Sequence, residues 1–148
     1  MTKQLTLSEI KKQDKQFENK KRILLGESGE YYVDINIKFR PTLIQQMIAE
    51  LTDKMLQIKE QNIEFKYMDI YSLLLLIKYF TSFKVPDELS EQIKVLELLI
   101  DGGYFGAIVN EFDEEELKKV ADTIKKAGEF LPKYFEQIIE NNQETVVG

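Results

Sequence analysis

The hydrophobic pattern of the chain is densest in residues 66–83, where apolar side chains fall on nearly every face of a predicted helix. A helix that is apolar all round has to be buried on all sides or lie in a membrane. Its unbroken apolar run, Leu73 to Ile77, is five residues long, far short of the roughly 18 that mark a membrane span. We therefore predict that residues 66–83 form the central buried helix of a globular domain, and we expect no membrane association.

Upstream of this helix, the pattern changes to an alternation of apolar and polar residues, which is typical of a half-buried β-strand. A short apolar run, Ile23–Leu25, precedes the alternating stretch, and Gly26 and Gly29 between the two runs suit a hairpin loop. We predict one β-hairpin over about residues 22–39. Two strands alone are marginally stable, so the apolar face of the hairpin has to pack on helices. The residues expected on that face are Tyr31, Val33, Ile35, Ile37 and Phe39.

Apolar residues spaced three and four apart predict amphipathic helices over the rest of the chain. Thr6 with Glu9, and Thr42 with Gln45, have the spacing of capping boxes that begin helices. Gly128 and Pro132 interrupt the pattern near the C-terminus, where we expect a break. The predicted helices cover residues 7–20, 43–60, 87–101, 104–112, 114–127 and 131–140.

These elements predict a mainly α (α+β) fold, a helical bundle around the central helix with one N-terminal hairpin. A chain of 148 residues fits a single domain with a sizeable core. We divide it into a basic helical arm (1–22), one globular domain (23–140) and a polar tail (141–148) that we expect to be disordered.

Composition narrows the chemistry that the chain could perform. It contains no cysteine, which rules out disulfides and thiolate metal sites and suits a reducing cytoplasm. It also contains no histidine, the usual general base and the commonest metal ligand. The N-terminus lacks the apolar region of a signal peptide. We therefore expect a non-catalytic protein without a cofactor that stays in the compartment where it is made.

Charge is unevenly distributed along the chain. The net charge is −6, but residues 1–22 hold seven Lys/Arg against three Asp/Glu, a local charge of +4. The remainder holds 13 against 23, a local charge of −10. Neutralisation of phosphates by Lys and Arg supplies most nucleic-acid affinity. An acidic body therefore makes nucleic acid an unlikely partner, with the basic arm as the exception to consider.

Two features of the sequence are candidate chemical sites. Lys78 lies inside the apolar central stretch, and a buried lysine with a depressed pKa can act as a base. More often such a lysine extends its stem along the core and places its ammonium in water. Asp113–Glu116 is the densest acidic cluster, but it lacks the glycine turn and alternating ligands of a calcium loop. An N-cap at Asp113 with acidic residues in the first helical turn explains this cluster, so we predict no metal site.

The C-terminal apolar stripe is the partner-binding surface that the sequence favours, because it follows the Gly128/Pro132 break. An apolar helix face of this kind could dock an amphipathic helix of another protein. Simple packing on the core is an equally good interpretation of the same stripe. The residues concerned are Tyr134, Phe135, Ile138 and Ile139.

Several short motifs, spread over most of residues 1–127, point to a known family. They are Leu-Thr-Leu-Ser-Glu-Ile-Lys-Lys from Leu5, Phe39-Arg-Pro-Thr42, Tyr67-Met-Asp-Ile-Tyr71, Val85-Pro-Asp-Glu-Leu89 and Leu98-Leu-Ile-Asp-Gly-Gly-Tyr104-Phe. Together they resemble small prophage-encoded proteins of Gram-positive bacteria akin to the tail assembly chaperones of long-tailed phages.

The resemblance implies a non-catalytic assembly factor in the cytoplasm of the bacterial host. Such chaperones are thought to cover the tape measure protein, keep it soluble and help recruit tail tube subunits. Self-association stays open, and no binding residue can be carried over from the family. The alternative is a phage-encoded regulatory or nucleic-acid-associated protein that uses the basic N-terminal arm.

Overall fold

The computed structural model describes residues 1–128 and confirms a mainly helical fold with one antiparallel hairpin. The two strands pair from Lys20 opposite Asn36 to Leu25 opposite Tyr31. In chain order the elements are α1 (Leu7–Asp14), the 3-10 helix η1 (Lys15–Glu18), β1 (Lys20–Leu25), β2 (Tyr31–Asn36), α2 (Pro41–Glu60), the 3-10 helix η2 (Met68–Ile70), α3 (Tyr71–Phe80), α4 (Leu89–Asp101), α5 (Tyr104–Val109) and α6 (Glu114–Gly128).

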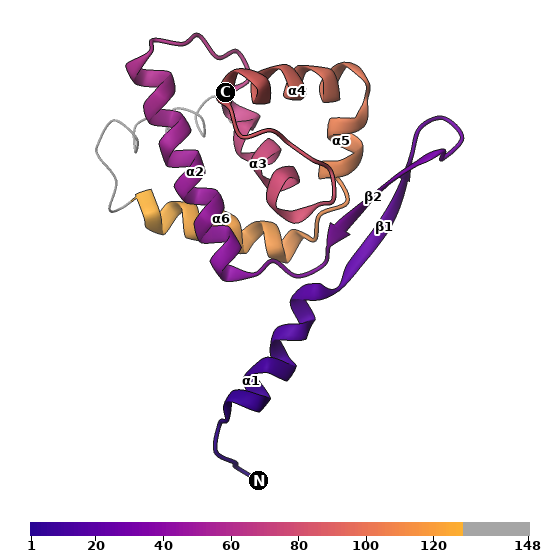
Figure 1. Cartoon of the computed structure of the whole chain (residues 1–148), viewed down its shortest axis with the longest axis vertical. Coiled ribbons are helices and arrows are strands. Elements are labelled where there is room, and N and C mark those ends of the chain that lie inside the picture. The colour runs from indigo at the N-terminus through magenta and orange to yellow at the C-terminus, as the bar shows by residue number, and fades with distance from the viewer. Residues whose placement is uncertain (129–148) are drawn as a thin grey trace.

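Helix α3 is the centre of the fold, as the hydrophobic pattern predicts. It lies in the middle of the body, with α2, α4, α5 and α6 arranged around it (Figure 1). Six of its ten residues are buried, and they are Tyr71, Leu74, Leu75, Leu76, Ile77 and Phe80. An apolar side chain contributes about 1.5–3 kcal/mol on full burial, so this short helix supplies a large share of the core.

The predicted bounds of the central helix, 66–83, are too wide at both ends. Residues Met68–Ile70 form a 3-10 turn, and Thr81 is extended, with φ −137° and ψ 168°. Thr81 forms a β-bridge with Ile35, and the N–H of Ser82 donates to the carbonyl of Asp34 at 2.9 Å. The backbone at 81–82 therefore bonds to the outer edge of β2 instead of continuing the helix.

The hairpin is confirmed, but its strands cover residues 20–36 and not 22–39. The helix expected over residues 7–20 ends correspondingly early, because its last turn tightens into η1 and Lys20 already pairs in β1. Of the predicted inner-face residues, Val33, Ile35 and Phe39 are buried. Ile37 lies beyond the end of β2 and is 38% exposed, and Tyr31 is 58% exposed at the distal end of the hairpin.

Helix starts depend on different caps from those that spacing suggests. Pro41 occupies the first turn of α2 behind Arg40 as N-cap, so the Thr42/Gln45 capping box is wrong; proline is favoured at this position because the N–H it lacks would be unpaired anyway. Thr6 does cap α1, accepting from the N–H of Glu9 at 3.3 Å. Asp113 caps α6, accepting from the N–H groups of Glu115 and Glu116.

Candidate functional site

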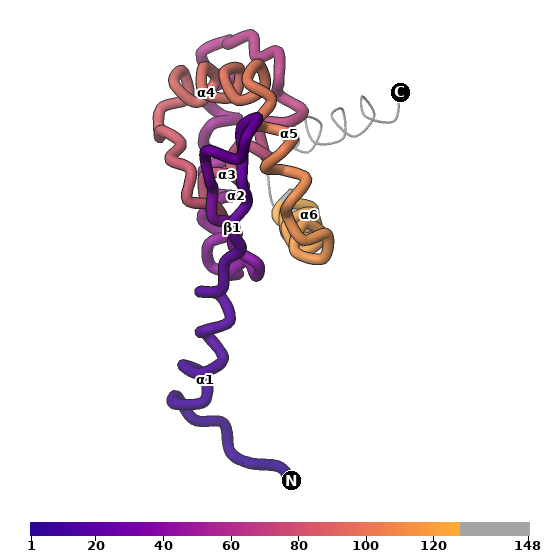
Figure 2. Tube along the Cα trace, turned by 90° about the vertical axis from the view of Figure 1, so that its right-hand side faces the viewer, coloured from indigo at the N-terminus to yellow at the C-terminus, as the bar shows by residue number. Residues whose placement is uncertain are grey.

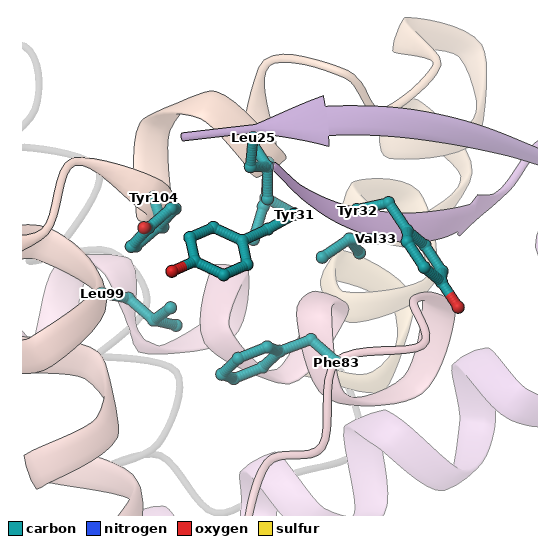
Figure 3. Close-up of a pocket in the computed structure, with 8 residues that line it drawn as sticks. Leu25, Tyr31, Tyr32, Val33, Phe83, Leu99 and Tyr104 are labelled. Atoms are coloured by element: carbon teal, nitrogen blue, oxygen red, sulfur yellow. The ribbon is translucent and has the colours of Figure 1, made fainter. Parts of the chain in front are cut away.

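An apolar pocket of about 280 Å³ opens between the distal part of the hairpin and the α4–α5 pair. Figure 3 shows the Tyr31 side chain between Tyr104, Leu99 and Phe83, with the Tyr32 ring turned away from them. Tyrosine rings combine an apolar body with a polar tip, which suits a surface that is partly wet. The remaining residues that line the pocket are Leu25, Tyr32, Val33 and Ile108.

The hairpin turn fixes Tyr31 at the mouth of this pocket. Gly26 and Gly29 both have positive φ, at 93° and 69°, a conformation that side-chain-bearing residues rarely adopt. The Glu30 carboxylate accepts hydrogen bonds from the N–H and hydroxyl of Ser28, at 3.0 and 2.8 Å. Hydrogen bonds from its own backbone and from Ser28 lower the pKa of Glu30. The turn is therefore anionic and locally ordered immediately before Tyr31.

The N-terminal arm is the second unusual surface. Helix α1 has no buried residue and projects away from the body, as two perpendicular views show (Figures 1 and 2). Leu5, Leu7 and Ile10 are 64%, 65% and 46% exposed. The arm is attached at its base, where Arg40 pairs with Asp14. An apolar stripe on a helix normally faces a partner or a core, and here it faces solvent.

A cluster of polar side chains lies between α2, α3 and α4. Glu50 accepts hydrogen bonds from Lys78 Nζ at 2.6 Å, from the Tyr79 hydroxyl at 2.7 Å and from Gln92 Nε2 at 2.7 Å. Burial would raise the pKa of Glu50, but these hydrogen bonds outweigh it and the pKa is lowered. Burial and the Glu50 carboxylate raise the pKa of Tyr79. Glu50 is thus held as a carboxylate that joins three helices.

The same cluster reaches the segment before α4. Lys54 Nζ donates to the carbonyl of Asp87 at 2.6 Å, and Gln92 Nε2 donates to the carbonyl of Pro86 at 2.8 Å. The Tyr71 hydroxyl donates to Gln92 Oε1, and both of these side chains are fully buried. Buried polar groups are costly unless they are hydrogen-bonded. Mutual satisfaction of these groups explains why the loop into α4 is fixed against α2.

Lys78 is part of this cluster, and its ammonium is ion-paired with two carboxylates. Its Nζ lies 2.6 Å from Glu50 Oε1 and 2.7 Å from Asp87 Oδ1. Burial would lower the pKa of Lys78, but the hydrogen bonds that its ammonium donates to Asp87 and Glu50 raise it. A lysine that serves as a base needs a depressed pKa, so Lys78 is a structural cation that links α3 to α2 and to Asp87.

The acidic segment Asp113–Glu116 does not gather its carboxylates around one point. Asp113 caps α6, whereas Glu116 is fully buried and turns inward. Within residues 1–128, no three His, Cys, Asp or Glu side chains lie close enough together to hold a metal ion. No helix in the same part of the chain is long and apolar enough to cross a membrane.

The predicted partner-binding residues Tyr134, Phe135, Ile138 and Ile139 lie outside the described residues. Sequence reasoning did not single out the pocket, because its lining comes from β1, β2, α4, α5 and the segment after α3. The alternation does place Tyr31 on the correct face of β2. The position of Tyr31 at the end of that alternation was the one available signal for the pocket, since a tyrosine at the end of a strand can extend its ring beyond the core.

Comparison with known proteins places the chain in a family. The sequence model of the YomO family matches residues 7–147. A relative, the "SPbeta prophage-derived uncharacterized protein YomO" of Bacillus subtilis (strain 168), is 24% identical over 126 residues, which cover 84% of this chain and 75% of the relative. No solved structure matches the chain. Because the family match spans nearly the whole sequence, the protein belongs to the YomO family.

Proposed function

We propose that this protein is a prophage-encoded, non-catalytic protein-binding factor that acts as a chaperone in phage tail assembly. The prophage origin is supported by the relative's name, which describes it as derived from the SPbeta prophage. The chaperone activity and the tape measure protein as client come from the resemblance of the short motifs, and the site would act in the cytoplasm of the bacterial host.

The observation that carries the proposal is the Tyr31 pocket, an apolar hollow that opens beside the core. Its volume of about 280 Å³ lies at or below the small end of pockets for small molecules, which span roughly 300–1,000 Å³. Side chains from an amphipathic client helix suit a hollow of this size. Recognition of a helix by an apolar groove is a common mode of peptide binding.

A non-catalytic function is supported by what surrounds the polar cluster. Lys78 and Glu50 are ion-paired to each other, and the Tyr79 hydroxyl is engaged by Glu50. These groups bind one another, so none of them is positioned to exchange a proton with a substrate. The absence of histidine and cysteine points in the same direction.

The alternative, nucleic-acid binding by the basic arm, is less favoured. Lys12 lies 3.9 Å from Glu9, Lys21 lies 3.3 Å from Glu111, and Arg22 forms a 2.9 Å pair with Asp34. Phosphate binding would require these cations to leave their carboxylates, which weakens the electrostatic gain that drives such binding.

Coexpression tests the proposal. The tape measure protein encoded by the same prophage is produced with and without this chain, and its soluble fraction is measured. We expect the wild-type chain to raise that fraction, Tyr31→Lys to abolish the increase, and Ile37→Lys to retain it because Ile37 lies beyond the end of β2 and does not line the pocket. No increase with the wild-type chain, or equal activity of both variants, would contradict the proposal.

A further inference from the structure

The exposed large apolar side chains of residues 1–128 gather in two places. One group lies on the arm and consists of Met1, Leu5, Leu7 and Ile10. The other lies on the distal hairpin and α4 and consists of Leu24, Tyr31, Tyr32 and Leu98, of which Tyr31 and Tyr32 line the pocket; Ile37 belongs to neither group. Two apolar surfaces on one molecule raise the question of whether they fit each other.

The arm needs a partner to be stable as a helix. Helix α1 has eight residues, and isolated helices shorter than about 12–15 residues are marginal in water. Leu7 and Ile10 are one turn apart, so their side chains lie on one face of α1. Every residue of this helix is left unburied by the body. The missing stabilisation has to come from outside the chain's own core.

The two surfaces carry charges of opposite sign. The projecting residues 1–18 hold four Lys against three Asp/Glu, a net +1, because Lys20, Lys21 and Arg22 belong to β1. The pocket is bordered by the exposed acidic residues Glu27, Glu30, Glu97 and Asp101 and by two cations, Lys84 and Arg22, whose guanidinium lies 3.8 Å from the centroid of the Tyr32 ring, which leaves an acidic excess. Opposite charges around an apolar contact favour association and fix its orientation.

The arm cannot reach the pocket of its own copy. It leaves the body at the end of the hairpin opposite the turn (Figure 1). The six residues of β1 span roughly 20 Å at 3.3 Å per residue, and η1 is held at the base by the Arg40–Asp14 pair. An arm that fills this pocket therefore comes from another molecule.

We propose that the N-terminal arm of one copy docks in the Tyr31 pocket of a second copy, with Leu5, Leu7 and Ile10 as the inserted side chains. The inference rests on the same pocket as the proposed function, and it makes a second copy the occupant when no client is present. Each contact joins an arm to a pocket, so the two surfaces are different and can be disabled separately.

Sedimentation velocity of the full chain over a range of protein concentrations tests the association. We expect the wild type to be larger than a monomer. Leu7→Glu, which places a charge on the apolar stripe, and Tyr31→Lys, which places a cation in the apolar pocket, should each weaken association by about tenfold or more, a change of roughly 1.4 kcal/mol. Ser8→Glu and Ile37→Lys are the matched controls and should behave as the wild type does, because Ser8 lies on another face of α1 and Ile37 does not line the pocket.

Mixing the two defective variants gives the decisive result. The Leu7→Glu chain keeps an intact pocket and the Tyr31→Lys chain keeps an intact arm, so the mixture should form a one-to-one heterodimer although each variant alone is monomeric. Circular dichroism of each variant confirms that the body is folded, since Leu7 and Tyr31 are both more than half exposed.

Three outcomes would overturn the inference: a monomeric wild type, association that survives Leu7→Glu, or a mixture that stays monomeric. Association that survives Leu7→Glu would mean that another segment, such as residues 129–148, makes the contact. A monomeric wild type that still keeps the tape measure protein soluble would remove the self-association and leave the proposed function intact. The converse pattern, association without client solubilisation, would remove the proposed function alone.

Discussion

The carboxylate of Glu116 accepts a hydrogen bond from the backbone N–H of Phe39 at 2.8 Å, and both side chains are fully buried. The bond joins α6 to the segment between β2 and α2, across 77 residues of sequence. The second carboxylate oxygen, Oε2, makes no hydrogen bond of good geometry but lies 3.0 Å from Lys119 Nζ and 3.9 Å from Lys38 Nζ. The ion pairs compensate the buried charge.

Phe39 is itself a packing centre. Its ring stacks on Phe80 with centroids 4.1 Å apart and meets Phe112 edge-on at 5.7 Å. The hydrogen bond from the Phe39 N–H to Glu116 therefore helps to hold α3, α6 and the segment after α5 in place beside the hairpin.

Replacing Glu116 tests this link. We expect Glu116→Ala to lower the free energy of unfolding by about 1–3 kcal/mol, since the buried Phe39 N–H loses its acceptor. Glu116→Gln keeps an acceptor and should cost less. Glu115→Ala, at an exposed neighbour, should change stability by no more than about 0.5 kcal/mol. Urea denaturation measures all three, and equal costs for Glu116→Ala and Glu115→Ala would contradict the account.

The central helix gives a second prediction. Leu75 is fully buried in α3, so Leu75→Asp buries an unpaired charge and should unfold the domain. The milder Leu75→Ala should cost about 2–5 kcal/mol. Leu98→Asp, on the exposed side of α4, should leave the melting temperature nearly unchanged. A folded Leu75→Asp protein that melts with the wild type would show that α3 is not the centre of the core.

Glu50 makes stability dependent on pH. Its pKa is lower in the folded protein than its ordinary value of 4.5, so the unfolded chain binds the proton more readily. The stabilisation is therefore present above about pH 4.5 and is lost as pH falls through the lowered folded pKa. We expect Glu50→Gln to reduce stability at neutral pH and to flatten its decline in acid. Unfolding free energies measured between about pH 3 and pH 7 test this, with Asp53→Asn on the same helix as the control; an unchanged acid decline in Glu50→Gln would refute it.

Two glycines near α5 should respond in opposite directions to alanine. Gly103 has φ +78° with no atom near the position of an added Cβ, so Gly103→Ala suffers only the left-handed backbone penalty of about 1–2 kcal/mol. Gly106 lies inside α5 with equally open space. Gly106→Ala should stabilise the protein by about 0.5–1 kcal/mol, because alanine is the better helix former. Thermal unfolding of both variants checks the sign, and a shift in the same direction would be inconsistent with these conformations.

Local pattern accounts for most of the elements. The spacing of Met47, Leu51 and Met55 predicts α2, and all three are buried as expected. The acidic run at Asp113 predicts the cap that α6 has. Each of these features depends on residues close in sequence, whose periodicity and side-chain chemistry are enough to specify it.

The sequence by itself therefore determined the mainly helical class, the single hairpin and a buried helix at the centre, because each of these follows from the spacing of apolar residues within one continuous segment. Tertiary structure alone decided that Thr81 leaves the helix to join β2, that Glu116 turns inward to Phe39, and that Tyr31 stands over a pocket. Each of these depends on a hydrogen bond or a packing contact between segments far apart in the chain. Such contacts override local preference because a buried polar group has to find its partner wherever the fold places it.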